Sequence, residues 1–108
     1  MNGSFEIREY TEGGRSPFAE WFDDLDAVTA ARVDRYVRRL EAGNFGAAKS
    51  LHDGVFELRL DFGPGYRVYY GREGRTIIIL LGGGSKRRQD ADIAAAVERW
   101  KRYKQTKA

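Results

Sequence analysis

Residues 55–81 read VFELRLDFGPGYRVYYGREGRTIIILL, and this stretch contains three runs typical of β-strands. In the first run, apolar side chains alternate strictly with charged ones, which is the pattern of a strand with one buried face. The last run, TIIILL, is apolar on both faces, as expected for a central strand. Glycine-containing turns separate the runs. The stretch therefore predicts an antiparallel meander with strands at 55–62, 66–70 and 76–81 and turns at 63–65 and 71–74.

The alternation also predicts how the first two strands pair. Their apolar residues must share one buried face, because a slip of one residue would turn charged side chains into the core. That phase places Arg59 opposite Arg67 and Glu57 opposite Tyr69. These four side chains are expected to cluster on the other face of the sheet. The predicted buried set comprises Phe56, Leu58, Leu60, Tyr66, Val68 and Tyr70.

Helices are predicted before and after the meander in the chain. Ser16-Pro17 is a helix-start signal, because a capping hydroxyl precedes a proline that needs no donor in the first turn. Apolar residues then recur at helical spacing, and a second helix is closed by Gly43. The full set of flanking elements is a strand at 4–10, a helix from 17 to 25, a helix at 26–42, a loop at 44–50, a glycine bend at 82–84 and a helix at 86–103.

The predicted class is α+β, in the order β-α-α-β-β-β-α: an antiparallel sheet with an N-terminal helical hairpin and a C-terminal helix. A length of 108 residues fits one domain spanning 1–108. Cysteine is absent and the acidic residues form no cluster with metal-ligand spacing, so neither a metal nor a cofactor is expected. The N-terminus lacks a signal region and no apolar run approaches the ~20 residues that span a bilayer, so a cytoplasmic protein with no membrane partner is expected.

Charge is distributed unevenly along the chain. Residues 1–31 carry two basic and seven acidic side chains, a net of −5, whereas residues 32–108 carry 17 basic and nine acidic ones, a net of +8. A polyanion is therefore one candidate partner of the later part of the chain. A solvated helix face explains the same charge equally well, and charge alone does not separate the two interpretations.

Two arginines directly opposed on neighbouring strands repel each other. Arg59 and Arg67 are therefore explained either by an anion bound between them or by carboxylates that bridge them, for which Glu57 and Asp61 are available. The run Lys86-Arg87-Arg88 follows the central strand and is expected near Arg67. Three cations at a helix N-terminus oppose the helix dipole, which favours a ligand site at that place.

Three motifs give the chain a resemblance to a known family. They are LHDGVFELR at 51–59, GPGYRVYY at 63–70 and LLGGGSK at 80–86. With these motifs, the sequence resembles the RelE/ParE superfamily of bacterial type II toxins, in the addiction-module killer branch that is HigB-like and phage Gp49-like. The resemblance extends over nearly the whole chain.

The resemblance implies a compact RelE-like antiparallel sheet with helices packed on it and a cognate antitoxin encoded nearby. RelE-like members cleave mRNA on the ribosome, whereas ParE-like members poison DNA gyrase. The family's phosphate-contacting arginine matches Arg67, the basic residue on the preceding strand matches Arg59, and the basic residue after the central strand matches Lys86. The C-terminal Tyr or His that RelE-like enzymes use has no clear equivalent.

The predicted function is a ribosome-dependent mRNA endoribonuclease in which the RNA supplies its own 2′-OH as nucleophile. The alternatives are a non-enzymatic gyrase poison and an inactive relative that only binds an antitoxin. The expected partners are an antitoxin, which would form a hetero-oligomer with the chain, the ribosome and mRNA. The antitoxin is expected either on the basic groove or on the outer face of the first two helices. The candidate catalytic residues are Arg59, Arg67, Lys86 and Glu57 (as base), and the candidate RNA-binding residues are Arg87, Arg88, Tyr66, Tyr69 and Lys49.

Overall fold

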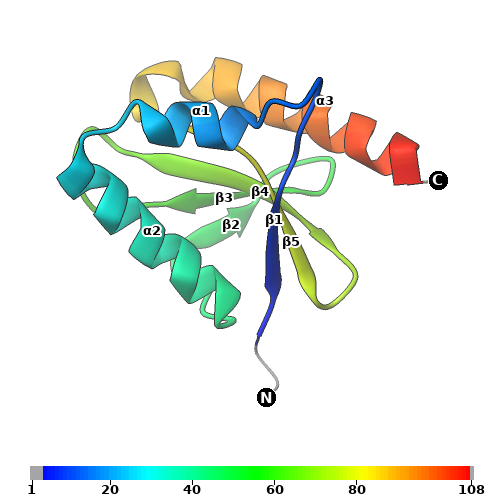
Figure 1. Cartoon of the computed structure of the whole chain (residues 1–108), viewed down its shortest axis with the longest axis horizontal. Helices are drawn as coiled ribbons and strands as arrows, with labels where there is room; N and C mark the ends of the chain where they lie inside the picture. Colours follow the sequence, from blue (N-terminus) through cyan, green and yellow to red (C-terminus); the bar gives the residue numbers. More distant parts are fainter. Residues whose placement is uncertain (1–3, 108) are drawn as a thin grey trace.

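The computed structural model describes residues 4–107 and has an α+β fold, as predicted. A five-stranded sheet lies between two helices on one face and one long helix on the other (Figure 1). The elements in chain order are β1 (Glu6–Glu9), α1 (Pro17–Asp23), α2 (Ala27–Glu41), β2 (Ala48–Ser50), β3 (Val55–Arg59), β4 (Arg67–Glu73), β5 (Ile77–Gly84), the 3-10 turn η1 (Lys86–Arg88) and α3 (Gln89–Lys107).

The sheet is mixed rather than antiparallel, with the strand order β1-β5-β4-β3-β2. β1 runs parallel to β5, because α1, α2 and the meander separate the two strands in the chain and such a crossover permits parallel pairing. The alternation of side chains carries no information on strand direction, so this part of the prediction was wrong. β2 adds a short antiparallel strand to β3 inside the predicted loop at 44–50. Three residues are too few to show a period.

The predicted register of the central hairpin is confirmed. Arg59 is the partner of Arg67 and Glu57 is the partner of Tyr69 across β3 and β4. β4 then pairs antiparallel with β5, which brings Gly84 opposite Arg67. The end of β5 therefore meets the start of β4, as expected.

Glycines that were predicted to form turns lie inside strands instead. Residues 71–73 belong to β4 and residues 82–84 to β5, so the turn is confined to 74–76. The reason is close packing by the helices. A Cβ on Gly71 would lie 2.5 Å from the Trp100 ring, and one on Gly83 would lie 2.2 Å from the Trp21 ring. Glycine is required there by the approach of an aromatic side chain, not by a bend.

Two cores occupy the two faces of the sheet. α1 and α2 cover one face, where Phe18, Val37 and Leu80 are buried. α3 covers the other face, where Val55, Tyr69 and Trp100 are buried. α1 begins at its predicted start signal, where Ser16 Oγ accepts from the Ala19 N–H at 3.0 Å, and the Asp26 side chain caps α2. α1 and α2 splay apart beyond their junction instead of packing as an antiparallel pair (Figure 1).

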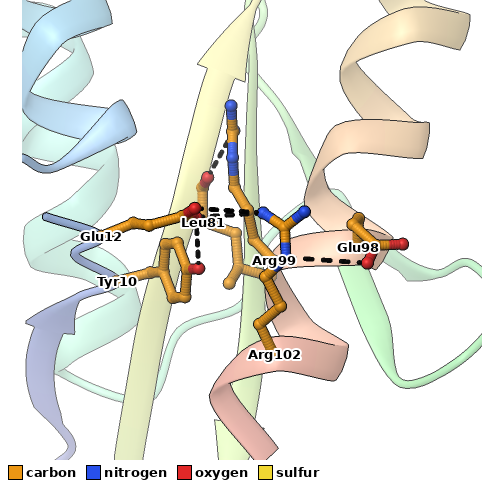
Figure 2. Close-up of polar contacts among 6 residues, drawn as sticks. All are labelled: Tyr10, Glu12, Leu81, Glu98, Arg99 and Arg102. Carbon is orange, nitrogen blue, oxygen red and sulfur yellow. Dashed lines mark hydrogen bonds and ion pairs between the residues drawn. The ribbon is translucent and has the colours of Figure 1, made fainter.

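Polar contacts bind α3 to the sheet and to the segment after β1 (Figure 2). The Arg99 Nη1 donates to the Leu81 carbonyl at 2.9 Å. The Tyr10 hydroxyl donates to Glu12 at 2.7 Å, and the same carboxylate accepts from Arg102 Nη1 at 3.0 Å. These contacts hold the second half of α3 against β5 and the segment after β1. Within residues 4–107, no helix is both long and apolar enough to cross a bilayer.

Candidate functional site

A buried ion pair between Glu57 and Arg67 forms the centre of the candidate site. The Arg67 Nε lies 3.3 Å from Glu57 Oε2, and the two side chains are only 7% and 2% exposed. The Arg67 Nη1 donates to the Gly65 carbonyl at 2.5 Å. A buried charge is stable only with a partner and with its remaining polar atoms bonded. The guanidinium of Arg67 is thus held by the ion pair with Glu57 and by the Gly65 carbonyl, while its buried Nε has no hydrogen-bond partner within residues 4–107.

Two further elements bring side chains to the Glu57 carboxylate. The Gln89 Nε2, on the first residue of α3, donates to Glu57 Oε2 at 2.8 Å. Lys49 is the cross-strand partner of Glu57 on β2, and its Nζ lies 3.8 Å from Oε1. Glu57 thus connects β2, β4 and α3, and it holds the first turn of α3 against the sheet.

A pocket of about 130 Å³ opens beside this pair at the β2 side of the sheet. Arg59 is exposed there, directly across from Arg67, and within residues 4–107 it forms no ion pair. Of the two arginines that carboxylates were expected to bridge, only Arg67 has a carboxylate partner within the described residues. Three cationic side chains surround one carboxylate, so the pocket suits an anion. Its lining residues are Ala47, Lys49, Glu57, Arg59 and Arg67.

The predicted convergence of Lys86 with Arg67 is present. The Lys86 N–H donates to the Pro64 carbonyl at 3.3 Å. A Cβ added to Gly65 would lie 2.9 Å from Arg67 Nη1 and 3.0 Å from Lys86 Cβ, so the two basic residues meet on either side of this glycine. Arg87 and Arg88 are exposed on the same short turn.

The three cations lie before α3 and not in its first turn. α3 begins at Gln89, and its first turn carries Asp90 and Asp92, the sign of charge that the helix dipole favours there. The predicted helix start at residue 86 was therefore wrong by three residues. Lys86, Arg87 and Arg88 instead line one side of an open cavity of about 410 Å³ that also contacts Gln89, Asp90 and Ala91.

Neither predicted stacking tyrosine lies in the pocket. Tyr69 has no exposed surface, because α3 covers the face of the sheet for which the sequence predicted no helix. Burial, together with the nearby Glu57 carboxylate, raises the pKa of Tyr69 well above its usual value. Its hydroxyl has no hydrogen-bond partner within the described chain. Tyr66 lies on the opposite face of the sheet, with its ring centroid 5.4 Å from that of Phe62.

Sequence reasoning missed Gln89 as part of the site. The residue follows three cations in a segment predicted to be already helical, so nothing marked it as the partner of a carboxylate 32 residues earlier. Asp92 was also missed. Its carboxylate lies against Gly84, and burial raises the pKa of Asp92 although Arg88 and Arg99 act in the opposite direction. Across residues 4–107, no three His, Cys, Asp or Glu side chains are grouped so as to hold a metal ion.

Known proteins resemble this chain over most of its length. The family described as phage derived protein Gp49-like (DUF891) matches residues 20–103. An uncharacterized protein of Haemophilus influenzae is 46% identical over 80 residues, which covers 73% of this chain and 81% of that protein. The family is associated with the toxins of toxin–antitoxin systems. The chain belongs to the Gp49-like family, a branch of the RelE/HigB-like toxins.

Proposed function

We propose that this protein is the toxin of a type II toxin–antitoxin pair and that it cleaves mRNA on the ribosome. The observation that carries the proposal is the pocket in which Lys49, Arg59 and Arg67 surround the Glu57 carboxylate. An RNA phosphate is an anion that such a pocket can bind in more than one position, because arginine donates two parallel hydrogen bonds to phosphate oxygens. Lys86, on the far side of Gly65, extends the basic surface along the RNA backbone.

The chemistry follows from what RNA itself provides. The 2′-oxygen attacks the neighbouring phosphorus, the bond from phosphorus to the 5′-oxygen breaks, and a 2′,3′-cyclic phosphate remains. The protein has to align the attacking oxygen and stabilise the additional negative charge on the phosphorane. Arg67 is suited to this role because its guanidinium is already fixed by Glu57 and Gly65 and needs little reorganisation. Arg59 and Lys49 supply mobile positive charge.

Proton transfer is assigned to two residues. Glu57 Oε2 is occupied by Arg67 and Gln89, whereas no hydrogen-bond donor within residues 4–107 reaches Oε1. We assign Oε1 to accept the proton of the 2′-OH and the ammonium of Lys86 to donate a proton to the departing 5′-oxygen. The exposed Arg87 and Arg88 then bind RNA phosphates, and this binding is expected to weaken steeply with salt.

The test is induced expression followed by primer extension on one reporter mRNA, with and without its start codon. Cuts should appear only in the translated reporter, should disappear for Arg67→Ala, and should fall at least tenfold for Arg59→Ala, which leaves the buried Glu57–Arg67 pair intact. The matched control is Arg75→Ala, an exposed arginine in the turn at the opposite end of β4, which should cut like the wild type. Intact mRNA accompanied by gyrase-linked DNA breaks would identify a gyrase poison. Normal growth with intact mRNA would identify an inactive antitoxin-binding relative.

A further inference from the structure

One face of α2 carries positive charge that no carboxylate compensates within residues 4–107. Arg32, Arg35 and Arg39 lie at positions i, i+3 and i+7, so their side chains project from the same face of the helix. All three are exposed, and within the described residues none of them forms an ion pair. Arg38, on a neighbouring face, is paired with two carboxylates of α2. Like charges at such spacings destabilise a helix, so the fold alone does not account for the three arginines.

Aromatic rings lie beneath two of these arginines. The Arg32 Cζ lies 4.1 Å from the centre of the Phe62 ring. The Arg39 Cζ lies 4.7 Å from the centre of the Tyr36 ring. The Tyr36 and Phe62 rings are 6.1 Å apart, and the Tyr66 ring follows 5.4 Å beyond Phe62. All three rings are partly exposed, so a row of aromatic and guanidinium groups runs from the β3–β4 turn onto α2.

This row begins beside the catalytic pocket. Tyr66 follows Gly65, the residue that separates Arg67 from Lys86. The Pro64 carbonyl in the same turn accepts from the Lys86 N–H at 3.3 Å. The turn between β3 and β4 therefore has basic residues of the pocket on one side and α2 on the other. A polymer bound at the pocket can continue across this turn onto α2.

Arginine and aromatic side chains in one row suit single-stranded RNA. Aromatic rings and guanidinium planes both stack on unpaired bases, and guanidinium N–H groups donate to phosphate oxygens. Contact with a ring already restricts the Arg32 and Arg39 side chains, so less conformational entropy is lost when a phosphate binds. Asp61, in the same turn, is exposed and opposes an anion, but the α2 arginines outnumber it.

We propose that the mRNA strand next to the cleaved phosphate lies on this surface, with its phosphates bound by Arg32, Arg35 and Arg39 and its bases stacked along Phe62 and Tyr36. The inference rests on the proposed function for the identity of the strand. The contact holds the mRNA over Arg67 and adds affinity that the small pocket does not supply by itself.

The experiment measures the anisotropy of a labelled single-stranded RNA oligonucleotide, methylated at its 2′-oxygens so that it is not cut, with the full chain. Arg32→Ala with Arg35→Ala and Arg39→Ala should weaken binding at least tenfold. The slope of log Kd against log salt should fall by about two, because each phosphate contact on a single strand contributes roughly 0.7. Phe62→Leu should weaken binding at least threefold with the slope unchanged, because it removes stacking surface and no charge.

The matched control removes the same charge from three exposed arginines that have carboxylate partners: Arg8→Ala with Arg15→Ala and Arg38→Ala. It should bind the oligonucleotide within threefold of the wild type and keep the salt slope. Both triple variants change only exposed side chains, so this comparison does not depend on how Phe62→Leu folds.

The proposal is wrong if the α2 variant binds the oligonucleotide no more weakly than the matched control. It is also wrong if that variant binds the oligonucleotide normally but binds mRNA-free ribosomes weakly, because the surface then contacts the ribosome and not mRNA. Absence of any oligonucleotide binding by the wild type overturns it as well. A wild type that binds the oligonucleotide but cuts no translated mRNA contradicts the proposed function, and the two triple variants still decide whether the α2 surface binds RNA.

Discussion

Arg59 and Arg67 face each other directly across β3 and β4, yet within residues 4–107 only Arg67 has an acidic partner. Arg67 is buried and held by Glu57 and the Gly65 carbonyl, whereas Arg59 is exposed. The two arginines therefore differ in what they contribute. Arg67 is part of both the fold and the site, while Arg59 contributes charge to the pocket without supporting the sheet.

Arg59→Ala is accordingly expected to separate activity from stability. The variant removes an unpaired charge that repels Arg67, so its free energy of unfolding should stay within about 0.5 kcal/mol of the wild type. Its mRNA cleavage should fall by tenfold or more, because a positive charge beside the phosphate is lost. Urea unfolding and primer extension measure the two effects. A loss of unfolding free energy large enough to account for the lost cleavage would contradict the separate roles of Arg59 and Arg67.

Glu57→Ala is expected to be strongly destabilising. Loss of the carboxylate leaves the Arg67 guanidinium buried without a counter-ion and Gln89 without its acceptor. Breaking a buried pair by removing one partner costs about 3–5 kcal/mol. Replacing both members, as in Glu57→Leu with Arg67→Leu, should be less destabilising than the sum of the two single changes. The comparison is a double-mutant cycle by urea unfolding, and additive values would show that the pair is not coupled.

Asp92→Asn should stabilise the protein at neutral pH. Burial raises the pKa of Asp92, so the folded state binds its proton more tightly than the unfolded state does. The native stability is then lowered as pH rises through the titration of this carboxyl, and the ionised form is unfavourable at pH 7. The Tm of the variant should exceed that of the wild type at pH 7, and the difference should shrink towards pH 3.5. A constant or opposite difference across that range would contradict the assignment.

Gly71→Ala should be destabilising although it replaces one small residue by another. The new Cβ would lie 2.5 Å from the Trp100 ring, so α3 must shift away from β4. Overpacking of this kind costs about 1–3 kcal/mol. Gly74→Ala is the control for removal of a glycine with free space around it, although its φ of +61° adds strain of its own. Thermal unfolding should show a lower Tm for Gly71→Ala. The tryptophan fluorescence of Gly71→Ala should also change, because its contact with Trp100 is altered, whereas that of Gly74→Ala should stay as in the wild type.

The sequence predicted the central hairpin well because burial and side-chain period act on the same residues. Only one register keeps Leu58 and Val68 in the core, so the pairing of Arg59 with Arg67 followed directly. The direction of β1 could not be predicted, since a parallel and an antiparallel edge strand show the same alternation. The packing of α3 on the sheet could not be predicted from the sequence either. This packing buries Tyr69 and brings the Gln89 side chain to the Glu57 carboxylate. Contacts between segments distant in sequence leave no local pattern.

The central claim is that the pocket around Arg67 directs the RNA's own 2′-OH against its phosphate. It is tested by programming purified ribosomes with a model mRNA that carries one 2′-deoxynucleotide at the mapped cleavage site. The account predicts that wild-type protein cuts the all-ribose mRNA to a 2′,3′-cyclic phosphate end and leaves the substituted mRNA intact at that site, while Arg67→Ala cuts neither. Cleavage of the substituted mRNA at the same position, or an Arg67→Ala protein as active as the wild type, would contradict it.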